Sequence, residues 1–225
     1  MAYIRCTGEG GSPTPPTAEP FIYNTNYVYF NTGYIHNANT KIRMKATFNT
    51  YWSYAQAFGA RSGSFGNYAL GFFATFNSAR CCFYRTGQEA PGQDYDANTP
   101  DNKAMFYSQP IIVECSGQDC SWYQENNPLR VCSLSATGAT VNSGIAPLGL
   151  FCCNNATSPN GWTPTDPIYM LLYWFEIYEN DTLLHRFVPA YNNGQYCLYD
   201  EVDQTYIYEA SNPSRVRGSD DIPTS

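Results

Sequence analysis

The sequence predicts an all-β protein built as a sandwich or a barrel. Aromatic residues make up 16% of the 225 residues, whereas charged residues make up only 14%. Amphipathic helices need polar faces rich in Lys and Glu, so this composition disfavours an α-helical protein. About a dozen short segments with strand-like patterning recur along the chain at regular spacing, which is typical of β-sandwiches and β-barrels.

The clearest of these segments lie within residues 173–200. Two arms filled with aromatic and β-branched residues are joined by the polar stretch Glu179, Asn180 and Asp181, which supplies the turn chemistry of a β-hairpin. A loop and a third short segment ending in Leu198, Tyr199 and Asp200 follow. We therefore expect a tight hairpin and a third strand at this end of the domain.

Further strand candidates precede the hairpin. Residues 41–49 alternate polar residues with the apolar residues Ile42, Met44, Ala46 and Phe48, which is the pattern of a half-buried strand. Residues 27–35 read as a strand with a glycine kink. The remaining candidates, divided by polar loops at 87–102 and 154–167, are residues 54–60, 68–75, 80–85, 103–108, 111–115, 130–134 and 148–153.

The two ends of the chain differ in composition from the rest. Residues 7–20 are rich in Pro and Gly and have no large aliphatic side chain, so residues 1–20 are expected to be an extended arm and linker. Tyr3 and Ile4 near its tip make it a candidate docking arm that adds to another subunit's sheet, with a disordered start as the alternative. Residues 21–209 would form the domain, and residues 210–225 a polar tail.

Charge and hydropathy disfavour two classes of partner. The net charge is −7 and the sequence has no run of Lys and Arg, which argues against binding to nucleic acid. The longest apolar stretch, residues 168–177, is too short to span a bilayer and contains Glu176, so no membrane partner is expected. No secretory signal is visible, and the chain is therefore expected to be made and folded in a cytoplasm.

The cysteines are expected to be reduced and buried. There are nine of them, an odd number, and with no visible signal peptide this favours free thiols over a disulfide framework. Cys115 and Cys120 have a spacing that some zinc sites use, but no His lies near them and no second close pair is present. Cysteines that act as small apolar residues are the favoured interpretation.

Three places in the sequence resemble the concanavalin A-like (laminin-G-like) jelly-roll domains. They are residues 29–34 (Tyr-Phe-Asn-Thr-Gly-Tyr), residues 57–61 (Ala-Phe-Gly-Ala-Arg) and the hairpin with its third strand, residues 173–200. Such domains are common in proteins of gut Firmicutes and in the tail and capsid-surface proteins of their phages. The resemblance covers most of residues 26–208 and implies an antiparallel jelly-roll β-sandwich.

The hairpin departs from the family pattern in an informative way. The family commonly has a basic residue where Glu176 stands and an acidic residue where Arg186 stands. Both signs are exchanged here, so we expect a salt bridge across the hairpin with reversed polarity. Asn31 and Cys197 also stand where the family usually has Asp and Gly. The resemblance therefore implies the fold but not a particular ligand site.

Catalytic chemistry finds little support in the residues. Some relatives with this fold are glycoside hydrolases, which need two carboxylates facing the sugar. No expected strand carries acidic residues at alternating positions, since Glu179 and Asp181 fall in the turn. The two histidines, His36 and His185, are not near a nucleophile elbow and are expected at the surface. A non-enzymatic protein is predicted, with a glycan hydrolase as the disfavoured alternative.

Candidate ligand-binding residues are aromatic, because the C–H faces of sugar rings stack on Trp and Tyr. Trp122, Tyr123 and Trp162 are expected in polar loops, at residues 121–127 and 160–163. Trp52, Tyr54 and Arg61 form a second candidate patch. The alternative is that these rings cap the sandwich core beneath their own loops.

No cofactor is expected apart from a candidate calcium ion. Many laminin-G-like and lectin-like domains bind calcium, and the loop at 87–102 offers oxygen ligands from Asp94, Asp96, Asn98 and Asp101. An EF-hand would have Gly and Glu where Thr99 and Met105 stand, so any site would be irregular. Asp and Asn are also ordinary loop-forming residues.

The resemblance implies a non-enzymatic phage protein at the virion surface, synthesised in the bacterial host cytoplasm. As a decoration, head-fibre or tail-associated protein it would assemble into multimers and dock on other virion subunits through its N-terminal arm. Its lectin-like domain would attach weakly and multivalently to cell-surface or mucin glycans. The alternatives are a purely structural decoration or tail protein that binds no sugar, and a bacterial surface or secreted protein with the same domain.

Overall fold

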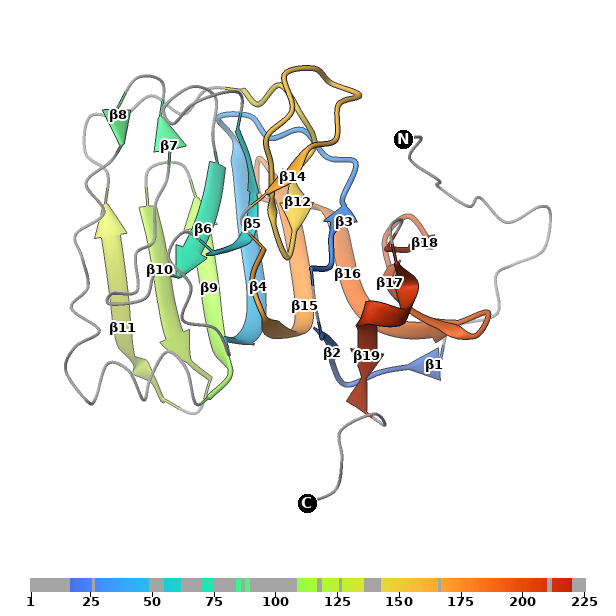
Figure 1. The fold of residues 1–225 in the computed structure, drawn as a ribbon. Helices are drawn as coiled ribbons and strands as arrows, with labels where there is room; N and C mark the ends of the chain where they lie inside the picture. Colours follow the sequence, from blue (N-terminus) through green and yellow to red (C-terminus); the bar gives the residue numbers. More distant parts are fainter. Residues whose placement is uncertain are drawn as a thin grey trace.

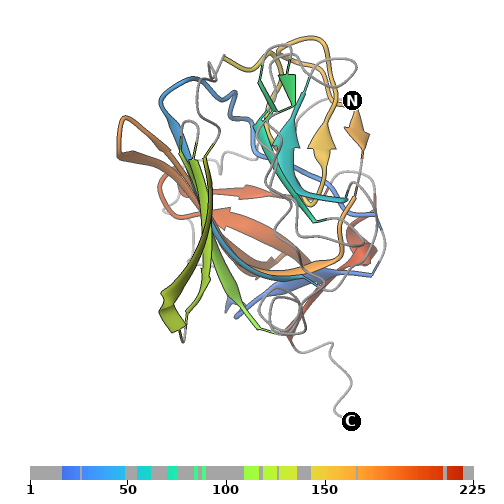
Figure 2. The same ribbon diagram turned by 90° about the vertical axis from the view of Figure 1, so that its left-hand side faces the viewer.

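The computed structural model describes residues 17–25, 27–48, 55–61, 70–74, 84–85, 88–89, 109–116, 119–125, 127–135, 143–165, 167–209 and 212–219. These residues form two main β-sheets that pack face to face, which confirms the predicted all-β sandwich (Figure 1). The view in Figure 2 shows the smaller sheet lying against one face of the larger sheet. The described part of the chain contains no helix that is long and apolar enough to cross a membrane.

As far as the structure describes the chain, the larger sheet has eleven strands, and all their pairings are antiparallel. Its main path runs through β11 (Asn127–Ser135), β10 (Asp119–Gln124), β9 (Ile111–Ser116), β4 (Thr40–Phe48), β15 (Met170–Glu179), β16 (Thr182–Asn192), β17 (Gln195–Asp200) and β18 (Thr205–Ile207). Three short strands join it from the side: β1 (Thr17–Ala18) on β16, β2 (Ile22–Asn24) on β15, and β19 (Val216–Gly218) on β2.

The smaller sheet has six strands, ordered β14 (Pro164–Thr165), β13 (Cys153–Asn154), β5 (Ala55–Ala60), β12 (Gly149–Leu150) and β3 (Phe30–Asn31), with β6 (Leu70–Ala74) on β5. β13 runs parallel to β5, and the other pairings are antiparallel. Among the described strands, β7 (Tyr84–Arg85) and β8 (Gln88–Glu89) pair only with each other. The sequence predicts one strand at 148–153, but Phe151 has a φ of +65° and separates β12 from β13.

Strand β4 forms where the alternation of polar and apolar residues predicts a half-buried strand. Its burial alternates strictly along all nine residues, as the alternation of polar and apolar residues predicts. Ile42 and Met44 face the smaller sheet, whereas Lys41, Arg43 and Lys45 face away from it and are only partly buried. β4 therefore contributes to the core on one face and carries a row of cations on the other.

The predicted hairpin is also confirmed. β15 and β16 are joined by Asn180 and Asp181, whose φ values are +48° and +61°. Two consecutive residues with positive φ are the mark of a type I′ turn, and Asn and Asp tolerate this conformation better than most residues. The third strand of the prediction is β17, which pairs with β16.

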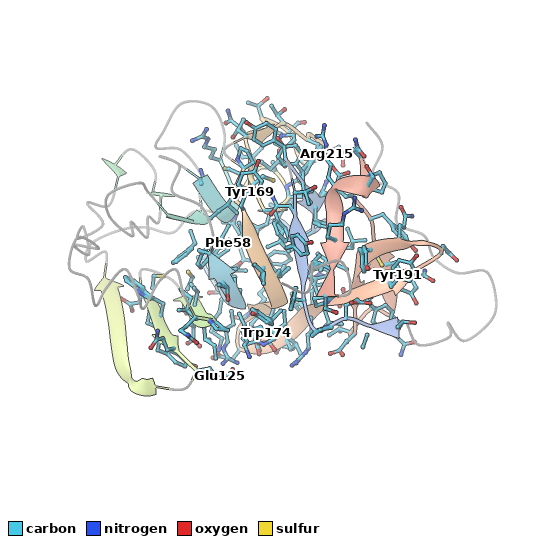
Figure 3. All side chains as sticks on the ribbon, turned by 60° about the horizontal axis from the view of Figure 1, so that its bottom comes forward. Phe58, Glu125, Tyr169, Trp174, Tyr191 and Arg215 are labelled. Atoms are coloured by element: carbon cyan, nitrogen blue, oxygen red, sulfur yellow. The ribbon has the colours of Figure 1, made fainter. Side chains whose placement is uncertain are left out.

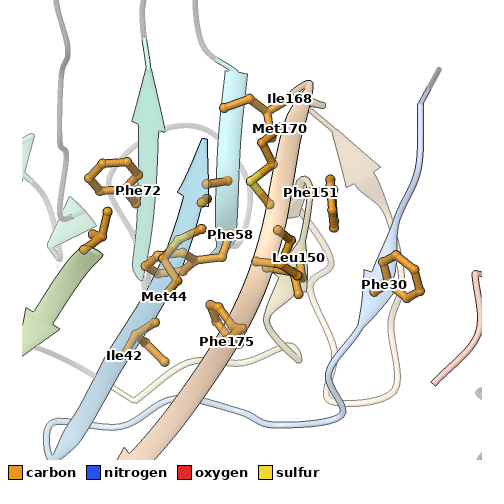
Figure 4. Close-up of a cluster of buried hydrophobic side chains, with 14 of the residues drawn as sticks. Phe30, Ile42, Met44, Phe58, Phe72, Leu150, Phe151, Ile168, Met170 and Phe175 are labelled. Carbon is orange, nitrogen blue, oxygen red and sulfur yellow. The ribbon is translucent and has the colours of Figure 1, made fainter. Parts of the chain in front are cut away.

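The core lies between the two sheets (Figure 4). Phe58 of β5 contacts Phe175 of β15 with ring centroids 5.4 Å apart, and Phe72 of β6 contacts Phe48 of β4 at 5.8 Å. Each fully buried side chain of this size contributes about 2–3 kcal/mol relative to an exposed one. One edge-to-face and one tilted ring contact therefore join the two layers.

The N-terminal end of the domain differs from the expected boundary at residue 21. β1 lies within the expected arm, yet Thr17 pairs with Tyr191 and Ala18 pairs with Ala190 on β16. The backbone N–H of Glu19 donates to the carbonyl oxygen of a neighbouring β16 residue at 3.2 Å. The arm is thus fixed to the larger sheet from residue 17 onward. Tyr3 and Ile4 lie outside the described residues.

The C-terminal end differs as well. The sequence predicts a polar tail at 210–225, but residues 212–219 pack on the larger sheet as η1 (Pro213–Arg215) and β19. Val216 is buried, and Gly218 lies so close to the ring of Tyr196 that an added Cβ would clash with it. A single apolar residue between polar neighbours was too weak a signal to predict this strand.

Candidate functional site

The face of the larger sheet that points away from the smaller sheet, here called the outer face, contains a β-bulge. Leu172 pairs with Ala46 and Trp174 pairs with Lys45, which are consecutive residues on β4, so Tyr173 is the extra residue. The bulge interrupts the alternation of the strand and places two neighbouring aromatic side chains, Tyr173 and Trp174, on the outer face. Both are partly exposed, and Figure 3 shows Trp174 at the lower edge, away from the core residue Phe58.

A row of cations from β4 lies over three aromatic rings of β15, those of Tyr173, Trp174 and Tyr178. Lys41 lies 4.8 Å from the ring centroid of Tyr178, Arg43 lies 5.7 Å from that of Trp174, and Lys45 lies 5.2 Å from that of Tyr173. Cation–π contacts at partly exposed sites are worth about 0.5–1 kcal/mol each. They hold the three rings in fixed positions on the outer face while leaving part of each ring accessible.

An ionic ladder crosses the same face at right angles to the strands. Its members, in spatial order from β9 to the turn after β17, are Glu114, Arg43, Glu176, Arg186 and Glu201. The successive nitrogen–oxygen distances are 3.0, 3.4, 2.9 and 2.9 Å. The predicted salt bridge between Glu176 and Arg186 is therefore confirmed, and it is one step of a longer series of alternating charges.

Glu176 is the buried centre of this ladder. The residue is only 4% exposed, and its carboxylate contacts Arg43 on one side and Arg186 on the other. The hydroxyl of Tyr178 also donates to it, at 2.8 Å. A buried carboxylate is costly unless it is paired, and these three partners compensate its charge.

The far side of the face is formed by β10 and the turn that follows it. Tyr123 lies on the outer face of β10, and Glu125 pairs with Lys45. Burial by itself would lower the pKa of Arg43, but hydrogen bonds to Tyr178 and Tyr123 and the charge of Glu176 raise it above its ordinary value. The guanidinium of Arg43 thus stays charged and links the aromatic residues of β15 with the one on β10.

Trp122 requires a correction. The sequence places it in a polar loop as a ligand candidate, but it lies on β10 with its side chain in the core and is 0% exposed. The alternation along β10 turns Cys120 and Trp122 inward and Tyr123 outward. Trp122 is thus one of the largest core side chains and has no surface to offer a ligand.

The other sequence candidates do not form one site. Trp162 lies in the loop before β14, beside the smaller sheet and away from the outer face, and is partly exposed. Arg61 follows β5, with Nη2 3.4 Å from the hydroxyl of Thr165, also at the smaller sheet. Of the proposed ligand residues that the structure describes, only Tyr123 belongs to the outer face. The remaining candidates, outside the described residues, are Trp52 and Tyr54 and the calcium candidates Asp94, Asp96, Asn98 and Asp101.

A second polar cluster lies where β16 passes the end of β17. In the described ranges, His185, Asp200 and Asp203 form a group whose ligand atoms lie within 4.8 Å of one another, as a metal site requires. One oxygen of Asp200 contacts Nδ1 of His185 at 2.7 Å, and the other accepts the backbone N–H groups of Arg186 and Val202. Both oxygens thus have partners within the protein, and the cluster fixes the turn after β17.

The charge state of Asp200 follows from these contacts. Burial by itself would raise the pKa of its carboxyl group, but the hydrogen bonds from His185, Arg186 and Val202 hold the pKa below its ordinary value. The carboxylate is therefore ionised at neutral pH and anchors the turn. His185 is partly buried and stacks on Phe187 with ring centroids 5.5 Å apart, so it is less exposed than the sequence suggests.

His36 is not at the surface either. It is 1% exposed, and neither ring nitrogen has a hydrogen-bond partner among the described residues. A Cβ at Gly144 would lie 2.5 Å from its Nδ1 atom, so the ring packs directly on the glycine backbone. Burial lowers the pKa of His36 from 6.5 to about 4. No sequence pattern around His36 indicates this burial.

The described cysteines are buried, as the sequence predicts. Five cysteines are buried thiols outside any disulfide in the part of the chain that the structure describes: Cys115, Cys120, Cys152, Cys153 and Cys197. In the described ranges no His, Asp or Glu joins Cys115 and Cys120 to make a metal site. For these five residues the predicted burial is confirmed.

Comparison with known proteins does not extend these observations. The sequence matches no known family model and no curated protein.

Proposed function

We propose that this chain is a non-enzymatic, lectin-like module that binds glycans on the outer face of its larger sheet. The observation that carries the proposal is the bulge at Tyr173, which places Tyr173 and Trp174 side by side on that face. Bulges often re-aim side chains next to functional sites. Adjacent, partly exposed rings that are held by cations suit the stacking of a sugar ring.

The ionic ladder supplies the polar part of such a site. Arg43 and Arg186 carry N–H groups that can donate to a sugar, Glu114 and Glu201 carry carboxylate oxygens that can accept from it, and these donors and acceptors alternate from strand to strand. Neighbouring strands are about 4.8 Å apart, so donors and acceptors recur at short intervals along the face. A neutral saccharide with many hydroxyl groups needs both hydrogen-bond donors and hydrogen-bond acceptors. Cations and carboxylates balance closely here, which favours neutral over strongly anionic glycans.

The proposed context is multivalent display. A sheet face contacts a ligand from one side only, so each copy would bind weakly, and repeated copies would supply avidity. The resemblance of the hairpin to concanavalin A-like jelly-roll domains supports a jelly-roll topology and a place on the surface of a phage virion. In that setting the segment before β1 would dock on other virion subunits, and the outer face would contact cell-surface or mucin glycans.

A glycan array tests this function. The full chain is displayed multivalently and compared with Trp174→Ala, which removes the larger ring of the bulge, and with Trp162→Ala, which removes the partly exposed tryptophan beside the smaller sheet. We expect saccharide binding that falls at least tenfold in Trp174→Ala and is retained in Trp162→Ala. Each variant is checked for cooperative unfolding.

The other outcomes are equally informative. Binding that is lost only in Trp162→Ala would move the site to the smaller sheet. If the wild-type chain binds no glycan on the array, glycan binding is refuted and a purely structural decoration or tail role is favoured. A calcium-dependent signal would support the predicted site at Asp94, Asp96, Asn98 and Asp101.

A further inference from the structure

Two buried thiols face each other across the hairpin formed by β9 and β10. Cys115 and Cys120 are directly paired in the register of these strands, and their Sγ atoms are 3.2 Å apart. Directly paired residues of antiparallel strands have Cα atoms about 4.5–5.5 Å apart, which lies inside the range that a disulfide spans. Both side chains point into the core, so neither must leave its face of the sheet to reach the other.

We propose that Cys115 and Cys120 are a modification site: a dithiol that a disulfide oxidant converts into a cross-strand disulfide. The thiolate of one cysteine attacks a sulfur of the oxidant, forms a mixed disulfide and releases the first oxidant thiol. The thiolate of the second cysteine then attacks the mixed disulfide and releases the second oxidant thiol. The protein loses two protons and two electrons, and the oxidant is reduced to two thiols.

The surroundings of the pair determine when this reaction takes place. Burial, followed by the hydrogen bond with Cys120, raises the pKa of the Cys115 thiol well above its ordinary value. Thiolates are the reacting species, so the closed hairpin reacts slowly. Oxidation therefore proceeds while the chain folds in the presence of oxidant, or when the β9–β10 hairpin opens. A chain folded in a reducing cytoplasm keeps the dithiol until it meets an oxidising environment.

Cys197 provides a contrast within the same molecule. It is a buried thiol like those of the pair, and burial raises its pKa to about 12. Its Sγ atom, however, donates to the carbonyl oxygen of Ala190 at 3.5 Å instead of facing a second sulfur. Burial alone thus does not create the proposed site, and Cys197 serves as the matched control.

The disulfide would act on the outer face through β10. Tyr123 lies three residues after Cys120 on that strand and contacts Arg43 across the sheet. A covalent link at Cys115 and Cys120 fixes the register of β10 on β9, and it constrains the unfolded chain. Closure of the pair therefore stabilises the strand that carries Tyr123 once the protein is outside a reducing compartment.

Oxidative refolding of the full chain tests the proposal. The protein is unfolded under reducing conditions, refolded with oxidised and reduced glutathione, and mapped as non-reduced peptides by mass spectrometry. After cleavage at Asp119, which separates the two cysteines, we expect a peptide pair linked through Cys115 and Cys120 whose mass is about 2 Da below that of the two free peptides. The oxidised protein should unfold at a higher temperature than the same protein after reduction.

Two variants complete the experiment. Cys120→Ser should abolish both the linked peptide and the temperature shift, whereas Cys197→Ser should retain both. Free thiols at 115 and 120 after refolding of the wild-type chain, or their linkage to other cysteines, would overturn the proposal. This outcome is read from the wild-type peptide map and does not depend on whether a variant folds.

Discussion

The carboxylate of Glu176 is the residue on which the outer face depends. It is buried, and it bridges Arg43 and Arg186, whose side chains are 31% and 40% exposed. The ladder would separate into two isolated ion pairs without it. Each of those pairs is more exposed than Glu176, and exposed ion pairs contribute little to stability.

We expect Glu176→Gln to lower the free energy of unfolding by about 2 kcal/mol, because it leaves two guanidinium groups without their shared partner. The value is below that of a fully buried pair, since both arginines reach solvent. Glu114→Gln, at the exposed end of the ladder, is the control and should cost less than about 1 kcal/mol. Urea unfolding measures both, and equal effects would show that the ladder has no buried centre.

His36 makes stability depend on pH. The unfolded chain takes up a proton at this residue near pH 6.5, whereas the folded chain does so only near pH 4. The unfolded state therefore binds more protons between these values, and stability falls as the pH is lowered through this window. A shift of this size corresponds to a loss of about 3 kcal/mol between pH 7 and pH 4.

The measurement is urea unfolding of the wild-type chain and of His36→Leu at several pH values between 4 and 7. The variant should lose the part of the slope that lies above pH 4, because it has no group to protonate there. Asp200, whose pKa is lowered, contributes stability that is lost at lower pH, as its carboxylate is protonated. Parallel curves for wild type and His36→Leu would contradict the buried, neutral state of His36.

Among the single elements, β15 contains a bulge that we expect to matter for ligand binding but not for folding. Residues before and after Tyr173 keep their inward or outward direction if this one residue is removed, since Leu172 and Phe175 then alternate regularly with Trp174. The extra residue is therefore not needed to keep the apolar side chains of β15 in the core.

Deleting Tyr173 should leave cooperative unfolding in place, with a change in stability of less than about 2 kcal/mol, and should reduce glycan binding at least tenfold. Circular dichroism with urea unfolding checks the fold, and the glycan array checks the ligand. Deletion of Tyr169, upstream of β15, is the control, because it shifts the chain outside the strand without removing an outer-face ring. Full glycan binding by the Tyr173 deletion would show that the bulge is not part of the site.

The C-terminal strand β19 should contribute to the stability of the domain. Ending the chain after residue 209 removes Val216 from the core and its pairing strand from β2, so we expect a loss of about 2–4 kcal/mol. Val216→Ala in the full chain should cost less, about 1–2 kcal/mol. Thermal unfolding compares the three proteins, and an unchanged midpoint for the shortened chain would contradict the placement of β19.

The sequence predicts the elements that have a regular pattern. β4 alternates without interruption and β15, β16 and their turn combine aromatic arms with Asn180 and Asp181, so both are found. The sequence does not predict strand β10. Most residues in and around it are polar, so the segment with Cys120 and Trp122 resembles a loop that contains a tryptophan. The bulge is missed because period-two reasoning assigns Tyr173 and Trp174 to opposite faces.

At the scale of the whole molecule, composition and strand spacing are enough to predict two packed sheets, because few charged residues and many aromatic residues suit no other class so well. The five residues of the ionic ladder are spread along the sequence from Arg43 to Glu201. They become neighbours only through the order of the strands in the sheet, which the sequence pattern does not give. The pair of Glu176 and Arg186 was predictable only from the exchanged charges at these two positions. The tight turn alone would place Glu176 opposite His185, and an irregularity in β16 shifts the register by one residue. The jelly-roll topology and the docking arm stay predictions.

We propose that the outer face of the larger sheet attaches the molecule to glycan-covered surfaces. The most direct test of this proposal is the binding of the multivalently displayed full chain to whole bacterial cells, with Trp174→Ala and Trp162→Ala variants that unfold cooperatively. We expect cell binding by the wild-type chain and by Trp162→Ala, competition by soluble glycans, and a loss of binding of at least tenfold in Trp174→Ala. Undiminished cell binding by Trp174→Ala would contradict it.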